Sequence, residues 1–319
     1  MNELLRIENL FVRDEDRILL KEVSLSLPEN ETLAFIGESG SGKTLTLKAI
    51  LSLLPDDVEV TGGSVFLSGK DMYALKAREK RKLLGGNVGF VPQNTVNYLH
   101  PLLRIGDQMC DGYVTFHGRK SRKEAEEKAV KLLKSVGIND AERVMNSYPA
   151  ELSGGMRQRV NIAGALMMDP PLLISDEPTS ALDRIVQKQV ADLYLSLLEK
   201  RKLSLIIVSH DLVFVSRIAD KIAVFYSGRI VETGTKDELF QSPVHPYTKA
   251  LFALSPSLEQ DRTEPLKEIK GYISEEDRKR DGCPFAPRCP HAINECFTFS
   301  EVIGLSPTHS VLCRLGSVK

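Results

Sequence analysis

The sequence lacks the features that mark a membrane-spanning or secreted chain. No apolar run approaches the ~20 residues that span a bilayer. Residues 1–6, which read MNELLR, lack the charged and apolar regions of a secretory signal. We therefore expect a cytosolic chain, and docking of that chain on a membrane protein stays open.

A surplus of charge is also missing, because 42 Lys and Arg residues balance 43 Asp and Glu residues to a net charge of -1. This balance gives no general attraction to nucleic acid or anionic lipid. The five cysteines, four of them after residue 280, are not typical of a disulfide framework. Internal repeats and low-complexity tracts are absent. With 319 residues and 42% apolar content, the chain has room for one large domain and a smaller appendage.

The stretch at residues 37–44 reads GESGSGKT and fits the phosphate-loop pattern G-x-x-x-x-G-K-[ST]. A strand-like apolar run precedes it, and residues 45–51 have helical spacing, so backbone N–H groups and the positive helix end converge on one place. A flexible loop before an ordinary helix is the alternative, but Gly-Lys-Thr at a helix start would have no packing purpose. The predicted ATP-binding residues are Gly37, Glu38, Ser39, Gly40, Ser41, Gly42, Lys43, Thr44 and Leu45. Lys43 can reach the β and γ phosphates, and the Thr44 hydroxyl can ligate Mg²⁺.

The rest of the chain alternates between strand and helix patterns. Strand-like runs at residues 171–175 and 203–208 enclose a predicted helix at 185–200, which favours a mostly parallel α/β sheet. Residues 3–36 are rich in strand patterns, and residues 222–232 suggest a hairpin. Residues 94–168 have helical periodicity, including an amphipathic helix at 121–136 with a predicted capping box of Ser121 and Glu124.

Further motifs follow in a fixed order. Residues 152–159 read LSGGMRQR, residues 172–178 read LLISDEP, and residues 180–183 read SALD. Gln93 ends an earlier strand pattern and His210 ends a later one. At residues 4–255 the sequence resembles the nucleotide-binding subunits of ATP-binding cassette (ABC) transporters, and LSGGM is the specific part of the resemblance.

This resemblance implies a fold and a division of the chain. The fold is an α/β, ABC-type phosphate-loop ATPase with a mostly parallel core sheet, an N-terminal antiparallel β region and a helical subdomain. The ATPase domain would cover residues 1–255, with the helical subdomain at about 94–168. Residues 256–319 would be a linker and a small C-terminal extension that contains the cysteine cluster.

Catalytic roles follow from strand ends and from the resemblance. Asp176 at the carboxyl end of a strand would hold Mg²⁺ through water, and Glu177 would polarise the attacking water as general base. The resemblance implies that Gln93 contacts Mg²⁺ and the attacking water. It also implies that His210 contacts the γ-phosphate.

The LSGGM stretch predicts a second anion site. Ser153 can cap a helix there, and Gly154 and Gly155 expose backbone N–H groups. The resemblance implies that these residues close over the nucleotide held by a second subunit, with Asp183 at the same interface. The expected working unit is therefore a dimer of cassettes with two ATP molecules between them.

Two departures from the family pattern stand out. The aromatic residue that normally stacks on adenine is missing from residues 13–17, so Arg13 or Arg17 is a candidate for stacking and Phe11 is a candidate for the core. The adenine contact stays open. Ser175 occupies a position that is usually apolar, and we expect it to hydrogen-bond within the sheet.

The C-terminal part resembles one branch of the family. Residues 244–251, VHPYTKAL, resemble a stretch of the dipeptide, oligopeptide and nickel importers. The spacing of Cys283, Cys289, Cys296 and Cys313 alone fixes no metal. The resemblance favours a [4Fe–4S] cluster, while zinc with His291 or His309 and metal-free thiols are alternatives. This C-terminal extension, called the tail below (residues 256–319), is either a structural clip or a contact for the partner ATPase or permease. Cys110, which lies outside the tail, is expected to be buried.

Together these observations predict an ATPase subunit of an importer for peptides or a related small solute, such as chelated nickel. It would act at the cytoplasmic face of the inner membrane with a second ABC ATPase, two permease subunits and, indirectly, an extracytoplasmic solute-binding protein. A heterodimer is favoured over a homodimer, and no nucleic-acid partner is expected. A soluble ABC ATPase of DNA repair or translation, or a regulatory ATP-binding module, is the alternative. The sequence does not specify the cargo.

Overall fold

The computed structural model describes residues 3–15, 17–93, 98–179, 184–254, 269–299 and 301–317. The chain divides into two compact units. Unit 1 combines Met1–Ala74 with Val208–Lys319, and unit 2 is Leu75–Ile207. The N-terminal part and the C-terminal tail therefore fold together.

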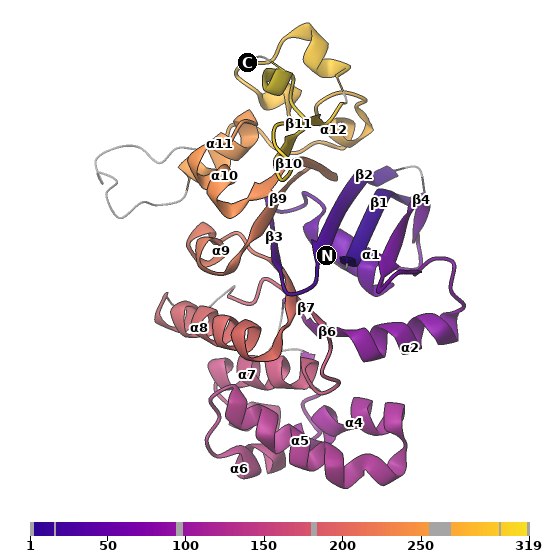
Figure 1. Ribbon diagram of the computed structural model, residues 1–319, viewed down its shortest axis with the longest axis vertical. Helices are drawn as coiled ribbons and strands as arrows, with labels where there is room; N and C mark the ends of the chain where they lie inside the picture. The colour runs from indigo at the N-terminus through magenta and orange to yellow at the C-terminus, as the bar shows by residue number, and fades with distance from the viewer. Residues whose placement is uncertain are drawn as a thin grey trace. The chain divides into compact units, whose positions relative to one another are not determined.

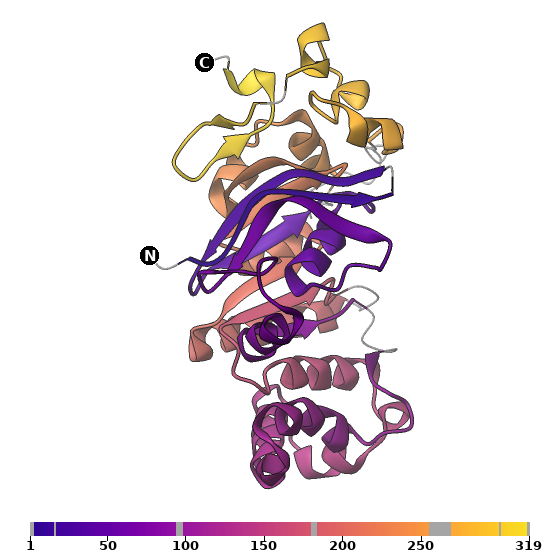
Figure 2. The same ribbon diagram turned by 90° about the vertical axis from the view of Figure 1, so that its right-hand side faces the viewer.

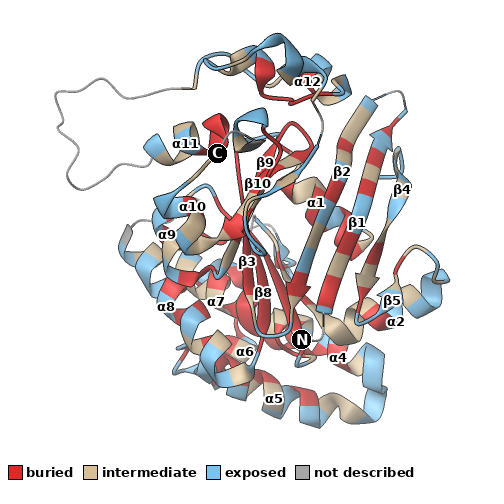
Figure 3. Cartoon of the chain, turned by 45° about the horizontal axis from the view of Figure 1, so that its top comes forward, coloured by how far each residue is buried: buried red, intermediate tan, exposed pale blue. Residues whose placement is uncertain are grey.

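Unit 1 contains an antiparallel sheet in the order β2-β1-β4-β5. Its strands are β1 (Glu3–Asp14), β2 (Arg17–Pro28), β4 (Val58–Leu67) and β5 (Lys70–Asp71). Figure 2 shows the long strands side by side in indigo and violet. Exposed and buried residues interchange along β1 and β2 in Figure 3, as expected for strands with one solvated face.

A second sheet of unit 1 carries the loop at residues 37–44. Its strands, in the order β11-β12-β10-β9-β3, are β11 (Ile303–Gly304), β12 (Ser310–Val311), β10 (Arg229–Thr235), β9 (Lys221–Tyr226) and β3 (Thr32–Ile36). Strand β3 is wholly buried and runs parallel to β9. The predicted hairpin at 222–232 is confirmed as β9 and β10. The tail extends this sheet, because β12 pairs with β10.

Short helices complete unit 1 (Figure 1). They are α1 (Lys43–Leu51), α9 (Leu212–Ile218), α10 (Lys236–Gln241), α11 (Pro246–Ala253), α12 (Glu275–Lys279), and the 3-10 turns η3 (Ala286–Arg288), η4 (Asn294–Phe297) and η5 (Arg314–Ser317).

Unit 2 has a sheet part and a helical part. The sheet part comprises β6 (Val88–Val91), β7 (Leu172–Asp176) and β8 (Ser204–Val208), with α2 (Ala77–Asn87) and α8 (Arg184–Arg201). Strands β6 and β7 are parallel, as the alternation of strands and helices predicted. All residues of β7 and β8 are buried, as is usual for parallel strands covered on both faces.

The helical part comprises α4 (Ile105–His117), η1 (Arg119–Ser121), α5 (Arg122–Ser135), α6 (Ala141–Asn146), η2 (Pro149–Glu151) and α7 (Gly154–Ala165). The amphipathic helix predicted at 121–136 is confirmed as α5, whose apolar side is buried. The predicted capping box is wrong. The Ser121 hydroxyl donates to the carbonyl of Gly118 at 2.7 Å, and Glu124 instead accepts from the Tyr113 hydroxyl at 2.7 Å. Cys110 is buried, as expected.

Candidate nucleotide-binding site

The loop at residues 37–44 leaves β3 and enters α1 through strained backbone that only glycine tolerates. Gly37 has φ 144°, and a Cβ there would lie 2.2 Å from the carbonyl oxygen of Phe225. Gly42 has φ 108°, and a Cβ there would lie 2.8 Å from the Leu20 side chain. The glycines predicted from the pattern are therefore required by the fold itself.

Lys43 is buried at the start of α1, where its ammonium group is held by the loop. Its Nζ donates to the carbonyls of Gly37 and Glu38, each at 2.8 Å, and to the hydroxyl of Ser41 at 3.2 Å. A buried ammonium needs such acceptors because desolvation penalises its charge. Thr44 and Leu45 follow, half-buried, in the first turn of α1. The loop thus gathers a cation, backbone donors and a hydroxyl at one helix N-terminus.

His210 follows β8 and is exposed. The backbone N–H of Ser209 donates to the carbonyl of Phe35 at 3.2 Å, which ties this turn to the strand that leads into the loop. Asp211 caps α9 by accepting from the backbone N–H groups of Val213 and Phe214 at 2.9 and 3.1 Å. His210 is therefore positioned between the end of strand β8 and the Asp211 cap of helix α9.

In unit 2, the structure brings Gln93 and Glu177 together. Gln93 Nε2 donates to Glu177 Oε2 at 2.6 Å, and Asp176 is buried at the end of β7. Glu177 has φ 46°, a conformation that non-glycine residues rarely adopt and that recurs at functional sites. Two carboxylates and an amide thus lie at the carboxyl ends of neighbouring parallel strands.

Ser175 departs from the sequence prediction. Its hydroxyl shares a 2.7 Å hydrogen bond with the Tyr194 hydroxyl on α8, so its partner is a helix rather than the sheet. Both side chains are buried, and burial raises the pKa of Tyr194. The pair satisfies two buried polar groups that would otherwise be costly to bury.

The LSGGM stretch begins α7 on an exposed surface. The Ser153 hydroxyl accepts from the backbone N–H of Met156 at 3.3 Å, so the predicted cap is confirmed. Ser153 and Gly154 are exposed, and a Cβ at Gly154 would meet nothing within 4 Å. Gly155 follows, half-buried. Asp183 lies outside the described residues.

The three candidates for the adenine contact differ in their surroundings. Phe11 packs against Gly62, where a Cβ would lie 3.4 Å from the phenyl ring. Arg17 forms an ion pair with Asp14, and Arg13 is exposed.

The four tail cysteines are free thiols that line one small cavity of about 20 Å³. Cys283 and Cys313 are buried, and burial raises the pKa of Cys283 to about 12. His245 also lines this cavity. Its Nδ1 accepts from the backbone N–H of Tyr247 at 3.1 Å, so its Nε2 carries the proton toward Cys283 Sγ at 3.6 Å.

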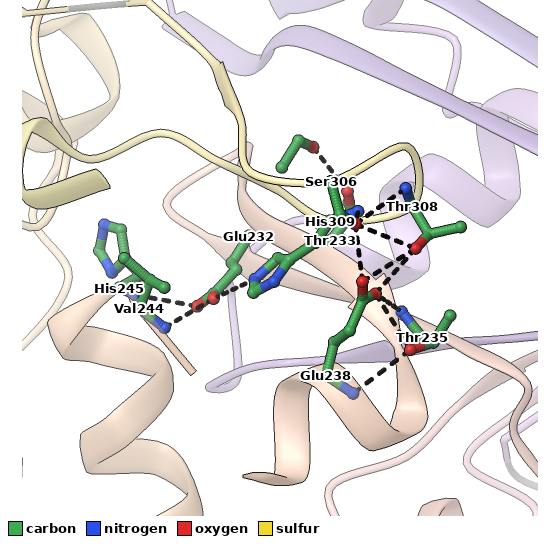
Figure 4. Close-up of polar contacts among 10 residues, drawn as sticks. Glu232, Thr233, Thr235, Glu238, Val244, His245, Ser306, Thr308 and His309 are labelled. Atoms are coloured by element: carbon green, nitrogen blue, oxygen red, sulfur yellow. Dashed lines mark hydrogen bonds and ion pairs between the residues drawn. The ribbon is translucent and has the colours of Figure 1, made fainter. Parts of the chain in front are cut away.

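The alternative zinc ligand His309 does not join the cysteines. Its Nε2 lies 2.8 Å from Glu232 Oε1, and Glu232 also accepts from the backbone N–H groups of Val244 and His245 (Figure 4). His291 does line the cavity. Within the described ranges, no three His, Cys, Asp or Glu side chains are grouped so that they could hold a metal ion. The metal prediction therefore gains no support here and stays a prediction.

Sequence reasoning missed residues far along the chain that contact the loop, among them Arg288 and Tyr247. Arg288 forms a two-pronged ion pair with Glu38, at 2.8 and 3.1 Å, across 250 residues of sequence. The Tyr247 hydroxyl accepts from the backbone N–H of Glu38 at 2.8 Å. The only sequence signal was the unusual carboxylate inside an anion-binding loop, since such a charge needs a cation nearby.

Two family models match this chain. The model for the ABC transporter matches residues 20–180, and the model for the oligopeptide/dipeptide transporter, C-terminal region, matches residues 231–296. The chain therefore belongs to the ABC transporter family, and it is an ATPase of that family. The predicted fold class and family are confirmed.

The chain is similar to transport ATP-binding proteins over most of its length. The oligopeptide transport ATP-binding protein AppD of Bacillus subtilis is 40% identical over 303 residues, which cover 93% of this chain and 92% of AppD. The dipeptide transport ATP-binding protein DppD of the same organism is 38% identical over 298 residues, which cover 93% of this chain and 88% of DppD. The dimeric structure of MJ0796, a bacterial ABC transporter cassette, matches with a TM-score of 0.65 and 28% identity over 73% of this chain and 98% of that chain.

Across the described part of the chain, no helix combines the length and apolar character that a bilayer-spanning segment needs.

Proposed function

We propose that this protein is the ATP-hydrolysing subunit of an importer for peptides or a related small solute. The observation that carries the proposal is the contact of Gln93 with Glu177 beside the buried Asp176. A strand-end carboxylate held by an amide is placed to orient and deprotonate a water molecule. ATP binding would close a cassette dimer, and hydrolysis would reopen it.

The roles of the residues follow from their chemistry. Lys43 would transfer its hydrogen bonds from the loop to the β and γ phosphates, and the loop N–H groups would hold the same oxygens. Thr44, Gln93 and Asp176 would hold Mg²⁺, which when bound neutralises charge on the phosphates. Glu177 would accept the proton of the attacking water, and Gln93 would keep the Glu177 carboxylate aligned. His210 would contact the γ-phosphate.

The exposed start of α7 supports the proposal of a dimer. Ser153, Gly154 and Gly155 would close over the nucleotide of a second cassette, together with Asp183. MJ0796, the similar cassette described above, is dimeric in its structure. The second cassette is proposed to be a related ABC ATPase rather than a second copy of this chain.

The substrate class is proposed from the relatives. AppD and DppD are named oligopeptide and dipeptide transport ATP-binding proteins, and the C-terminal family model carries the same description. This chain would dock at the cytoplasmic face of the membrane on two permease subunits, which an extracytoplasmic solute-binding protein supplies with solute. Peptides are the first candidate, and a nickel chelate is the second.

We also propose that Cys283, Cys289, Cys296 and Cys313 hold a [4Fe–4S] cluster, whose redox chemistry would be separate from ATP hydrolysis. Four cysteines that line one cavity are the donor set of such clusters. A single zinc ion would need its ligands within ~2.3 Å of one point, whereas a four-iron cluster spaces its thiolates more widely. His245 would donate to the Cys283 sulfur and orient it. Iron analysis and visible absorbance of anaerobically purified protein test this proposal, and protein without iron or absorbance would remove it.

Glu177→Gln tests the catalytic assignment. The amide keeps the size of the side chain and its contact with Gln93 but cannot accept a proton, so turnover should fall by at least about 100-fold while ATP still binds. The variant, mixed with the partner ATPase, should also accumulate as an ATP-bound dimer in size-exclusion chromatography. Hydrolysis at the wild-type rate would show that Glu177 is not the base.

Peptide import is tested by purification with the membrane subunits. Affinity-tagged protein should copurify with two permease subunits, and the reconstituted complex should hydrolyse ATP faster when peptide-loaded binding protein is added. Copurification with ribosomes or DNA instead would favour the soluble alternative.

A further inference from the structure

Arg288 is held in one position by every N–H donor of its guanidinium group. Its Nε donates to the carbonyl of Lys270 at 2.8 Å. Its Nη1 donates to Glu38 Oε2 at 2.8 Å and to the Tyr226 hydroxyl at 3.1 Å. Its Nη2 donates to Glu38 Oε1 at 3.1 Å and to the carbonyl of Ile269 at 2.9 Å. These contacts use all five donors, and only 6% of the side chain is exposed, so the arrangement is rigid.

Glu38 places a negative charge inside a loop that is built to receive phosphates. An unpaired carboxylate there would repel the incoming anion, and its attraction to Lys43 would compete with the phosphates. The bidentate pair with Arg288 neutralises that charge and turns the carboxylate toward the tail. The Glu38 backbone is fixed as well, because its N–H donates to the Tyr247 hydroxyl and its carbonyl accepts from Lys43.

A second arginine of the tail contacts the same loop. Arg278 Nη2 donates to the carbonyl of Gly40 at 2.9 Å. The loop is thus contacted at Glu38 and Gly40 by residues more than 230 positions away in sequence.

The tail segment that supplies these arginines is itself anchored to other parts of unit 1. Lys21 Nζ donates to the carbonyl of Arg280 at 3.0 Å, and Arg229 Nη1 donates to the carbonyl of Gly282 at 3.2 Å. The backbone N–H of Cys283 donates to the carbonyl of Cys296 at 2.9 Å. Arg288 therefore stands between an anchored cysteine segment and the loop, directly before Cys289.

We propose that residues 269–299 act as a positioning element for the phosphate loop, and that Arg288 is the positioning residue through which they act. Arg288 neutralises Glu38 and holds the loop in the conformation that receives the nucleotide. The inference rests on the proposed function, because it requires that this loop binds ATP. By thermodynamic reciprocity, nucleotide binding must in turn stabilise residues 269–299.

The test measures the Kd of full-length protein for a non-hydrolysable ATP analogue with Mg²⁺. Arg288→Met removes the charge and keeps most of the volume, and it should raise Kd about tenfold, within the usual 5- to 150-fold range of coupling between sites. Arg288→Lys should recover part of the affinity. Arg314→Met is the matched control, because Arg314 is exposed and directly follows Cys313, and it should leave Kd unchanged.

Glu38→Gln distinguishes the loss of charge neutralisation at Glu38 from a general loss of structure. The double variant Glu38→Gln/Arg288→Met should bind no more weakly than Glu38→Gln alone, because without the carboxylate no charge is left unpaired. Hydrogen exchange of peptides from residues 269–299 should slow when the analogue binds to wild type, and slow less in Glu38→Gln. This exchange comparison decides the question if Arg288→Met does not fold.

The inference fails if Arg288→Met binds within twofold of wild type, if the two substitutions act additively, or if the nucleotide leaves exchange of residues 269–299 unchanged. Failure of the proposed function looks different. In that case wild type itself does not bind the analogue, or Lys43→Ala binds it as well as wild type does.

Discussion

Helices α1 and α7 both have glycine at or next to their first residue and both direct an N-terminus at a predicted anion site, but the surroundings of the two N-termini are opposite. The start of α1 is enclosed, with Lys43 buried and Glu38 paired with Arg288. The start of α7 is exposed, with the Ser153 cap as its main support and open space at Gly154.

The two N-termini therefore differ in what they need from other groups to bind an anion. The loop before α1 already contains a cation, backbone donors and a neutralised carboxylate, so a monomer should bind nucleotide there. The start of α7 offers N–H groups and a helix dipole, and the arginine of its first turn, Arg157, donates to the carbonyl of Pro149 at 3.3 Å. A helix N-terminus alone binds anions weakly in water. The start of α7 should therefore hold phosphate only when a second surface supplies the rest.

Of the variants that test the difference between the two N-termini, Lys43→Ala should have the largest effect. The substitution removes the buried cation and its three loop contacts, so monomer affinity for ATP should fall by about 100-fold, or about 3 kcal/mol. Isothermal calorimetry measures this loss. Lys48→Ala on the exposed side of the same helix is the control and should bind normally.

The next largest effect should come from His309→Ala, which weakens the anchor of the tail. Glu232 would lose its side-chain partner but keep two backbone donors, so the free energy of unfolding should fall by about 2 kcal/mol. Chemical denaturation measures this change. His309→Gln, which can still donate to Glu232, should recover part of the stability, and equal losses in both variants would contradict the role of this hydrogen bond.

Gly154→Asp should affect anion binding at the start of α7 and leave nucleotide binding at the start of α1 unchanged. A side chain fits there without a clash, and an acidic residue at a helix N-terminus is favourable for folding. The monomer should therefore fold and bind ATP normally. The new charge should repel the phosphates of a second cassette, so ATP-dependent dimerisation with the partner ATPase should weaken at least tenfold, measured by analytical ultracentrifugation. Gly154→Asn is the uncharged control, and equal dimerisation of Gly154→Asp and wild type would contradict the assignment.

The smallest effect should come from Glu238, which links α10 to the tail (Figure 4). Burial alone would raise its pKa, but hydrogen bonds from Ser306, Thr235 and Thr308 outweigh burial and lower the pKa to about 2. Because the folded pKa lies below the unfolded value, its contribution is present above pH 4.5 and is lost as the pH falls toward 2. Glu238→Gln should cost about 1 kcal/mol at pH 7 and less at pH 3, as measured by urea unfolding.

The sequence was most informative where local chemistry dictates structure. The glycines of residues 37–44, the β3–loop–α1 order and the Ser153 cap all follow from backbone geometry over a few residues. The patterns around Glu177 and Gln93 predicted strand ends, and the parallel pairing of β6 with β7 then brought the two side chains together.

Predictions that depended on distant partners were less successful. The capping box at Ser121 failed because Tyr113 on the preceding helix takes the Glu124 carboxylate. Ser175 found a helix tyrosine rather than the sheet. His309 proved to be the partner of Glu232 rather than of the cysteines. In each case a polar side chain was satisfied by a group that sequence spacing does not bring near.

The phosphate loop and the alternation of strands and helices could be predicted from the residues alone, because they depend on backbone conformation and hydrophobic period, and the motifs identified the family. The pairing of the tail with the sheet of β3 and the ion pair of Arg288 with Glu38 became evident only in the folded chain. Such a pairing is fixed by packing of segments 250 residues apart, and no local rule of propensity or spacing encodes it.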